Sequence, residues 1–175
     1  AGEGLKWMAT DEEILEKYSR DQSFVPPRRP LVVTLPKTIE EIQEILRFAN
    51  AEKIPVVPYS SGAIQQGTTI PIMGGIIVDV SRMNRIIDID EESRTAAIEP
   101  GVTFAQLQDE ARRYGLRVCT PVGLPHYASV LSSYLEFSPL YSWSKYGTWF
   151  LLPMKVVLPS GDVIGTGSWA WEGSS

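Results

Sequence analysis

The segment from Tyr59 to Thr69 lies between two apolar stretches and is rich in small residues. It contains a serine pair, Ser60 and Ser61, and two glycines, Gly62 and Gly67. Glycine adopts positive φ without steric cost, and serine does not obstruct an approaching ligand. Such a loop can turn several backbone N–H groups toward one point and bind an anion, most often a phosphate. A long surface loop without a ligand has the same composition, so both interpretations stay open at this point.

Other kinds of site find less support in the sequence. No GxGxxG opens a helix and no GxxxxGK[ST] occurs, and the loop leads into a strand, which argues against a Rossmann or Walker phosphate site. The chain has one cysteine, Cys119, and one histidine, His126, which are too few soft ligands for the usual structural zinc site. We therefore predict no metal site and no internal disulfide.

Length and composition indicate a globular protein. The chain has 175 residues, of which 43% are hydrophobic and 21% charged, and can bury a core without covalent cross-links. A net charge of −5 argues against a nucleic-acid partner. No run approaches the ~18 apolar residues of a membrane span, and the N-terminus lacks the pattern of a signal peptide. We expect a cytoplasmic location.

The loop follows a predicted strand–helix–strand unit. An apolar β-branched run at residues 31–34 predicts a strand, and Thr38 with Glu41 predicts a capping box at the start of a helix. Apolar residues then recur on one helical face, namely Ile39, Ile42, Leu46 and Ala49. Pro55 ends the connection, and Val56-Val57 predicts the next strand.

Residues 95–121 repeat this pattern. A strand at 95–98 precedes a second capping box, Thr103 with Gln106, and a helix that Gly115 ends. A further strand is expected to end at Cys119, which we interpret as a small core residue. Residues 76–80 and 86–89 predict strands between the two units, and the polar set at 90–93 predicts a solvated hairpin tip.

The flanking regions predict shorter elements. Thr10 with Glu13 predicts a third capping box ahead of a helix through Tyr18. Residues 129–137 predict a short helix, and residues 150–167 predict two strands joined by a turn at 159–161. Together the elements indicate an α+β or α/β protein with two βαβ-like units.

Five stretches occur in the chain in this order: YSRDQSF, PLVVTLPKTIEEIQEILRFANAEKIPVVPYSSG, GGIIVDVSRMNRIIDID, AAIEPGVTFAQLQDEARRYGL and MKVVLPSGDVIGTG. They cover about residues 18–167 and resemble the FAD-binding domain of the vanillyl-alcohol oxidase and p-cresol methylhydroxylase superfamily, which includes FAD-linked glycolate and D-lactate dehydrogenases. The resemblance implies an α+β fold of the p-cresol methylhydroxylase type. Its expected parts are an N-terminal helix and extended lead-in at 1–29, a first FAD-binding subdomain at 30–92, and a second, truncated one at 93–175.

The resemblance also implies non-covalently bound FAD, because the first loop lacks the histidine that attaches FAD covalently in some relatives. The first loop would hold the pyrophosphate through Pro58, Tyr59, Ser60, Ser61, Gly62, Ala63 and Ile64. A second segment would contact the cofactor through Pro121, Val122, Gly123, Ser129, Ser132, Ser133 and Tyr146. No catalytic residue is predicted, although His126 could act as a base near the flavin or be purely structural.

Two departures from the family pattern define the alternatives. Serines stand where relatives often have runs of glycine, and the bulky side chains of residues 135–137 follow them. The expected cap domain, which shapes the substrate pocket, is absent from this sequence, so we expect a fragment or a small subunit. Tryptophans at 143, 149, 169 and 171 are expected to pack against a partner subunit or a missing domain, with an ordinary core as the alternative.

Two functions follow from this resemblance. The leading hypothesis is the FAD-binding portion of a flavin-dependent oxidoreductase that oxidises a small-molecule alcohol, 2-hydroxy acid or phenol. The alternative is a non-catalytic binding or assembly module that keeps the flavin fold without the cofactor.

Overall fold

The computed structural model describes residues 8–63, 66–121, 123–137 and 151–170. The chain forms two compact units. The first takes its described residues from 8–59, 66–79 and 152–170, and the second takes them from 60–63 and 80–151. The boundary expected at residue 92 therefore lies inside the second unit, and the observed division does not follow the order of the sequence.

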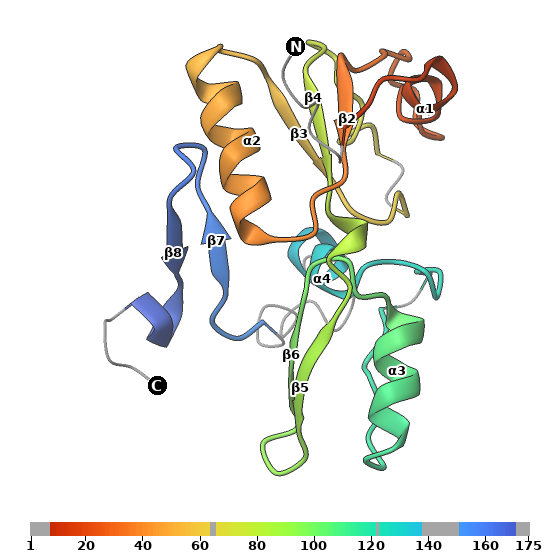
Figure 1. Cartoon of the computed structure of the whole chain (residues 1–175). Helices are drawn as coiled ribbons and strands as arrows, with labels where there is room; N and C mark the ends of the chain where they lie inside the picture. The colour runs from red at the N-terminus through yellow and green to blue at the C-terminus, as the bar shows by residue number, and fades with distance from the viewer. Residues whose placement is uncertain (1–7, 64–65, 122, 138–150, 171–175) are drawn as a thin grey trace. The chain divides into compact units, whose positions relative to one another are not determined.

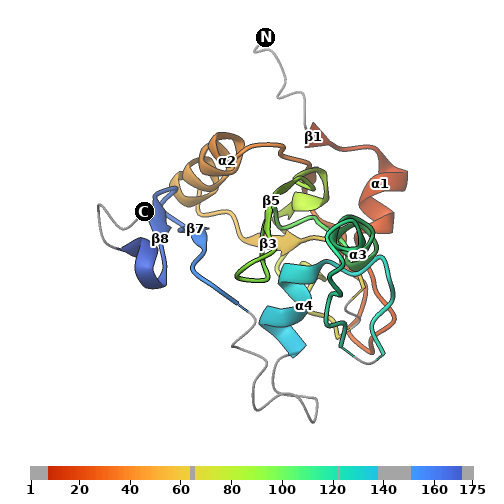
Figure 2. The same cartoon turned by 90° about the horizontal axis from the view of Figure 1, so that it is seen from below.

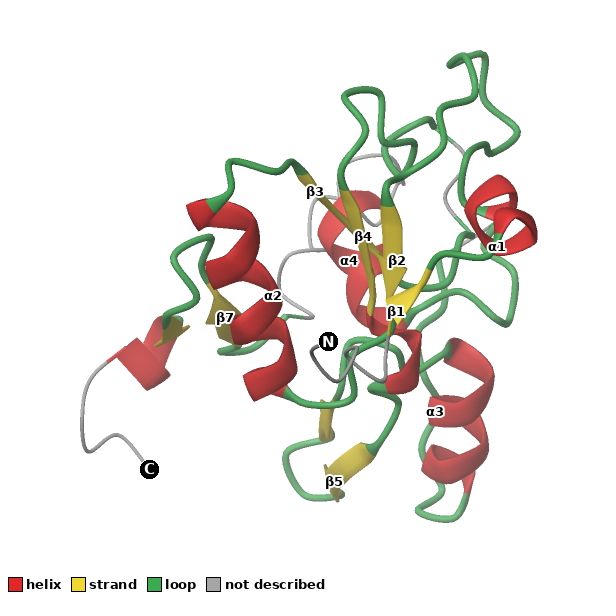
Figure 3. Cartoon of the chain, turned by 45° about the horizontal axis from the view of Figure 1, so that its top comes forward, coloured by secondary structure: helices red, strands yellow, loops and turns green. Residues whose placement is uncertain are grey.

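The first unit is built on a four-stranded sheet of order β1-β2-β4-β3 (Figure 1, Figure 3). Its strands are β1 (Met8–Ala9), β2 (Val32–Thr34), β3 (Val56–Tyr59) and β4 (Ile76–Asp79). β4 is parallel to both β2 and β3, whereas β1 is antiparallel to β2. The helix α2 (Ile39–Ala51) joins β2 to β3 and buries Ile45 and Ala49. The predicted strand–helix–strand unit is thus confirmed.

Helix capping follows the sequence only in part. At the start of α2, Thr38 accepts the N–H of Glu41, but the Glu41 carboxylate accepts the N–H of Lys37 and not that of Thr38. The first helix, α1 (Glu12–Lys17), has Asp11 as its N-cap, with no capping hydrogen bond from a side chain within the described residues. The capping box predicted one residue earlier, from Thr10, is therefore wrong.

The core of the first unit centres on three buried residues, Tyr18, Val33 and Ile77. Side chains from α1 and β3 pack around them. A hairpin of β7 (Lys155–Val157) and β8 (Val163–Gly165), followed by the 3-10 turn η3 (Gly167–Ala170), completes the unit. The hairpin turn is held on α2, because Gln43 Nε2 donates to the carbonyl of Gly161 at 2.6 Å.

The second unit contains the 3-10 turn η1 (Val80–Arg82), a hairpin of β5 (Ile86–Asp90) and β6 (Thr95–Ile98), and the helices α3 (Phe104–Arg112) and α4 (Val130–Phe137). Figure 2 looks along α3 with α4 beside it, and the rings of Phe104 and Tyr134 meet edge-on at 5.8 Å. The core residues come from α3 and from the segments that flank the two helices: Val102, Phe104, Leu107, Ala128 and Val130. The capping box of Thr103 and Gln106 is complete, as predicted.

One predicted strand of this unit is wrong. Residues 116–120, all of them described, form a loop, and Cys119 is exposed rather than a core residue. The Val118 N–H donates to the side chain of Gln108, so part of this stretch is paired with a side chain instead of a strand. The α+β class itself is confirmed, since helices and mixed sheets occur together.

Candidate functional site

The first predicted loop begins where β3 ends, with Ser60 to Ala63 in the second unit. Gly62 adopts φ 63°, the left-handed conformation that the loop composition predicted. Within the described part of the chain, the backbone N–H groups of Ser61, Gly62 and Ala63 have no backbone acceptor. All three residues are half-buried, and Ala63 packs against the core of its unit. The loop therefore presents backbone donors on an anchored segment.

The second glycine of the predicted loop has a different role. Gly67 has φ 81°, and its N–H donates to Asp21 Oδ2 at 2.7 Å. A Cβ at this position would lie 2.3 Å from Val25 Cγ2. The Gly67 N–H is already hydrogen-bonded within the first unit and is not available to an anion. The candidate anion site therefore consists of residues 60–63.

The second predicted segment is directly hydrogen-bonded to this loop. The Ser129 N–H donates to Ser61 Oγ at 3.0 Å, and the hydroxyls of Ser60 and Ser132 are 2.8 Å apart. These contacts span 68 and 72 residues of sequence. The structure thus brings together two segments that the sequence assigned to the same site.

The hydroxyls of Ser129 and Ser133, in the second segment, form hydrogen bonds with backbone groups. Ser129 Oγ donates to the carbonyl of Pro100 at 2.7 Å and accepts the N–H of Ser132 at 3.3 Å, which caps α4. Ser133 Oγ donates to the carbonyl of Ser129 at 2.6 Å. Ser129 and Ser133 are almost fully buried. These hydroxyls fix the amino end of α4 beside the loop.

Pro100, whose carbonyl accepts from Ser129, follows a buried carboxylate, Glu99, that is paired with the largely exposed side chain of Arg85. Glu99 is buried, and its carboxylate accepts from Arg85 N at 2.8 Å, Nε at 2.9 Å and Nη2 at 2.6 Å. Burial opposes ionisation of Glu99, but the hydrogen bonds and charge of Arg85 outweigh it and lower the pKa of Glu99. Glu99 thereby fixes the backbone at the neighbouring Pro100, whose carbonyl accepts from Ser129 Oγ. Sequence reasoning did not find this pair, because its two members lie 14 residues apart on different segments.

The structure says less about the role of the other predicted site residues. Pro58 and Tyr59 end β3, Pro121 is half-buried and Gly123 is exposed. Ile64, Val122 and Tyr146 lie outside the described residues. His126 is exposed, and its ring packs edge-on against Tyr127 at 5.8 Å.

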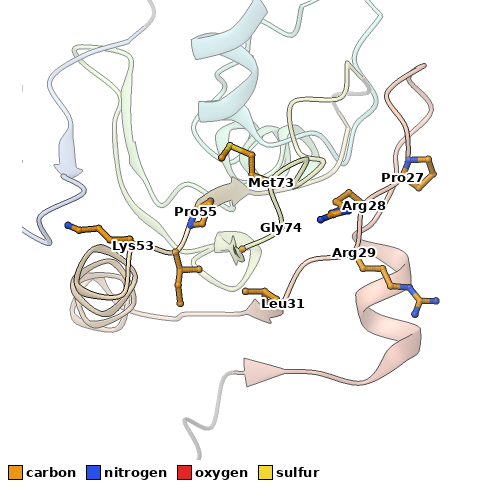
Figure 4. Close-up of a pocket in the computed structure, with 10 residues that line it drawn as sticks. Pro27, Arg28, Arg29, Leu31, Lys53, Pro55, Met73 and Gly74 are labelled. Atoms are coloured by element: carbon orange, nitrogen blue, oxygen red, sulfur yellow. The ribbon is translucent and has the colours of Figure 1, made fainter.

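A separate pocket of about 500 Å³ lies in the first unit (Figure 4). Its lining includes Arg28, Leu31, Lys53 and Met73. The lining residues directly precede β2, β3 and β4, so the pocket lies at the amino ends of these strands. The predicted loop, in contrast, follows the carboxyl end of β3. This pocket is therefore not the predicted anion site.

The described residues offer neither a metal centre nor a membrane-spanning helix. No group of three or more His, Cys, Asp or Glu side chains in that part of the chain could hold a metal ion. None of the helices described there is long and apolar enough to cross a membrane.

The comparisons with known proteins agree with the geometry. The family described as FAD binding domain matches residues 30–167. The chain is 33% identical over 151 residues to the flavoprotein subunit of 4-cresol dehydrogenase (hydroxylating) from Pseudomonas putida, covering 83% of this chain and 29% of that protein. It is 31% identical over 152 residues to a glycolate oxidase subunit of Bacillus subtilis, covering 86% of this chain and 32% of that protein.

A solved structure shows the same fold. The crystal structure of p-cresol methylhydroxylase with substrate bound matches with a TM-score of 0.79 at 29% identity, covering 95% of this chain and 33% of that chain. The chain spans about a third of the length of the curated relatives it matches.

Proposed function

Because this chain belongs to the FAD-binding domain family, in its p-cresol methylhydroxylase type, we propose that Ser61, Gly62 and Ala63 bind the diphosphate of FAD through their backbone N–H groups. The observation that carries the proposal is that these three donors have no backbone acceptor within the described residues. A bound cofactor would remove these N–H groups from water, where they need an acceptor, and a phosphate oxygen supplies one.

The surroundings of these donors fit a phosphate group. Gly62 in the left-handed conformation reorients the backbone between its neighbours, which is how consecutive N–H groups form a concave anion site. The serine pairs join the loop to the amino end of α4, an eight-residue helix whose dipole favours negative charge there. Residues 58–63 and 129–133 include no acidic side chain that would repel a phosphate.

At the level of activity, we propose that the chain is the FAD-binding part of an oxidoreductase for a 2-hydroxy acid, an alcohol or a phenol. Support comes from the names of the relatives, a cresol dehydrogenase subunit and a glycolate oxidase subunit. When bound, FAD supplies the hydride acceptor, while the protein holds and orients the cofactor. Of the predicted second segment, Ser129, Ser132 and Ser133 would set the position of the loop, and Gly123 would allow close approach of the cofactor.

We also propose that a further domain or a partner subunit completes the substrate pocket, in a cytoplasmic enzyme. The greater length of the two relatives, and the fact that both are subunits, support a further domain or a partner subunit. Of the predicted contacts to such a partner, Trp143, Trp149 and Trp171 lie outside the described residues, and Trp169 belongs to η3. In the alternative, a module without cofactor, water would satisfy these half-buried loop donors and the protein would not bind FAD.

Substituting Ser61 tests the proposal. Ser61→Glu places a carboxylate beside the bound phosphates, whereas Ser61→Ala removes only the acceptor for the Ser129 N–H. An added charge within ~4 Å of a phosphate costs roughly 2–4 kcal/mol at a surface site, so FAD affinity should fall about 30-fold or more. Titration of FAD, followed by flavin fluorescence, measures the Kd.

The matched control is Ser93→Glu, which adds the same charge at the exposed tip of the β5–β6 hairpin. This variant should bind FAD as the unaltered protein does. Equal FAD affinity of Ser61→Glu and Ser93→Glu would remove the loop from the cofactor site.

A further inference from the structure

The segment that follows α1 carries two side chains whose contacts the proposed site does not use. The first is Tyr18, whose hydroxyl donates to Asp79 Oδ2 at 2.6 Å. Its ring meets the ring of Tyr59 edge-on, with centroids 4.8 Å apart. Tyr59 and Asp79 are register partners at the carboxyl ends of β3 and β4. Tyr18 therefore fixes the residue directly before Ser60.

The second side chain is Asp21, three residues further on. Its Oδ2 accepts the N–H of Gly67 at 2.7 Å, and its Oδ1 accepts the N–H of Ser23 at 2.8 Å. Val25 of the same segment lies so close to Gly67 that a Cβ there would approach it to 2.3 Å. Asp21 therefore fixes the chain where it leaves the loop.

We infer that Tyr18 and Asp21 are positioning residues for FAD, because they hold the two ends of the loop whose middle presents Ser61, Gly62 and Ala63. This inference rests on the proposed function. It assigns a role to the YSRD stretch, which touches neither the three N–H donors nor Ser129 in the described structure.

The protonation states suit the role. Burial, followed by the hydrogen bond to Asp79, raises the pKa of Tyr18, so its hydroxyl keeps its proton and remains a donor. Burial opposes ionisation of Asp21, but the hydrogen bonds from Ser23 and Gly67 outweigh it and lower the pKa of Asp21. The hydrogen bonds of these two anchor residues, Tyr18 and Asp21, thus remain intact around neutral pH.

Fixing the ends of a loop acts on affinity through preorganisation. A loop that is free at its ends samples many conformations, and only a fraction of them presents the donors as the ligand requires. The apparent Kd rises by the inverse of that fraction. If loss of one anchor reduces the competent fraction to about one tenth, the Kd for FAD rises about tenfold.

Two variants with matched controls test the inference. Tyr18→Phe keeps the ring against Tyr59 but removes the hydrogen bond to Asp79, and Asp21→Ala removes the acceptor for Gly67. The control for Tyr18→Phe is Thr34→Val, which removes another buried hydroxyl bond of the same sheet, from Thr34 Oγ1 to the carbonyl of Ile77 at 2.8 Å.

The control for Asp21→Ala is Asp90→Ala. Asp90 also accepts backbone N–H groups in a turn, those of Glu92 at 2.8 Å and Ser93 at 3.1 Å, but in the β5–β6 hairpin. Titration with FAD should show a Kd about tenfold higher for Tyr18→Phe and Asp21→Ala, and within about twofold of the unaltered protein for both controls. Thermal melting of each protein reports the general loss of stability.

Amide hydrogen exchange in the FAD-free protein gives an independent readout. Both anchor variants should accelerate exchange of the buried Ser129 N–H, which donates to Ser61 Oγ of the loop, and both controls should leave it unchanged. If the unaltered protein does not bind FAD, the proposed function fails. If it binds, but the anchor variants bind equally well or the controls weaken binding to the same extent, the positioning role is overturned and the proposed function stands. Unchanged exchange of the Ser129 N–H in both anchor variants would overturn it too.

Discussion

Gly101→Ala should destabilise the second unit, because an added Cβ has no room among three backbone carbonyls. The Cβ would lie 2.6 Å from the oxygen of Val80 and 2.8 Å from the oxygens of Ser81 and Met83. Ordinary contact begins at 3.4 Å, so the Val80 carbonyl would have to retreat by about 0.8 Å. The Gly101 N–H also donates to the Met83 carbonyl at 2.7 Å, which ties both segments together. No side-chain rotation can relieve these contacts.

The net effect is the difference of two contributions. Overpacking against rigid backbone costs about 3 kcal/mol, while alanine restricts the unfolded chain and returns roughly 0.4–1 kcal/mol. We expect Gly101→Ala to lower the free energy of unfolding by about 2 kcal/mol. Urea denaturation followed by circular dichroism measures this change.

Gly115→Ala is the matched control within the same unit. A Cβ at Gly115 meets nothing within 4 Å, but its φ of 66° is strained for alanine. That strain costs about 1–2 kcal/mol, of which the restricted unfolded chain returns part. A loss for Gly101→Ala no larger than that for Gly115→Ala would refute the steric reasoning.

Three further changes test other parts of the structure. Glu99→Gln should reduce the loss of stability at acid pH. Arg85 keeps the pKa of Glu99 below its ordinary value of 4.5, so the carboxylate stabilises the fold above that pH. The stabilisation is lost as the pH falls through the lowered pKa. Unfolding free energies of both proteins between about pH 3 and pH 7 check this. Thr103→Ala should lower the unfolding free energy by about 1 kcal/mol in urea by removing the cap of α3, and Thr103→Ser should restore it. Arg28→Glu, in the pocket of Figure 4, should leave the FAD Kd unchanged in the same titration, because that pocket lies at the opposite ends of the strands.

Much of the fold was predictable because the signals are local. Apolar runs and capping residues located β2, α2, β3 and β4 to within a few residues. The prediction failed where a local pattern was overridden by other contacts in the folded chain. Thr10 has the spacing of a capping box, yet the helix begins after Asp11. Cys119 follows an apolar stretch, yet the loop around it pairs with the side chain of Gln108.

The candidate site could be predicted from the sequence only in part. The composition of residues 60–63 shows backbone freedom, which is a property of the residues themselves. Which amides are already engaged is a tertiary property, and Gly67, bonded to Asp21, shows that a second glycine in the same loop can serve the fold instead. The anchors Tyr18 and Asp21 lie about 40 residues before the loop, and their spacing alone suggests no contact with it.

Serine in place of glycine has a physical consequence in this chain. Glycine would permit the same close approach of the two segments but could not bond them through a side chain. Here the hydroxyl of Ser61 accepts from the Ser129 backbone and that of Ser60 pairs with Ser132, so the segments are cross-linked by hydrogen bonds that need no cofactor. In its bond with Ser129 the Ser61 hydroxyl accepts, so its own O–H stays available as a donor beside the backbone N–H groups of the loop. The serine hydroxyls thus join the two segments of the proposed site, so part of its geometry can form without the cofactor.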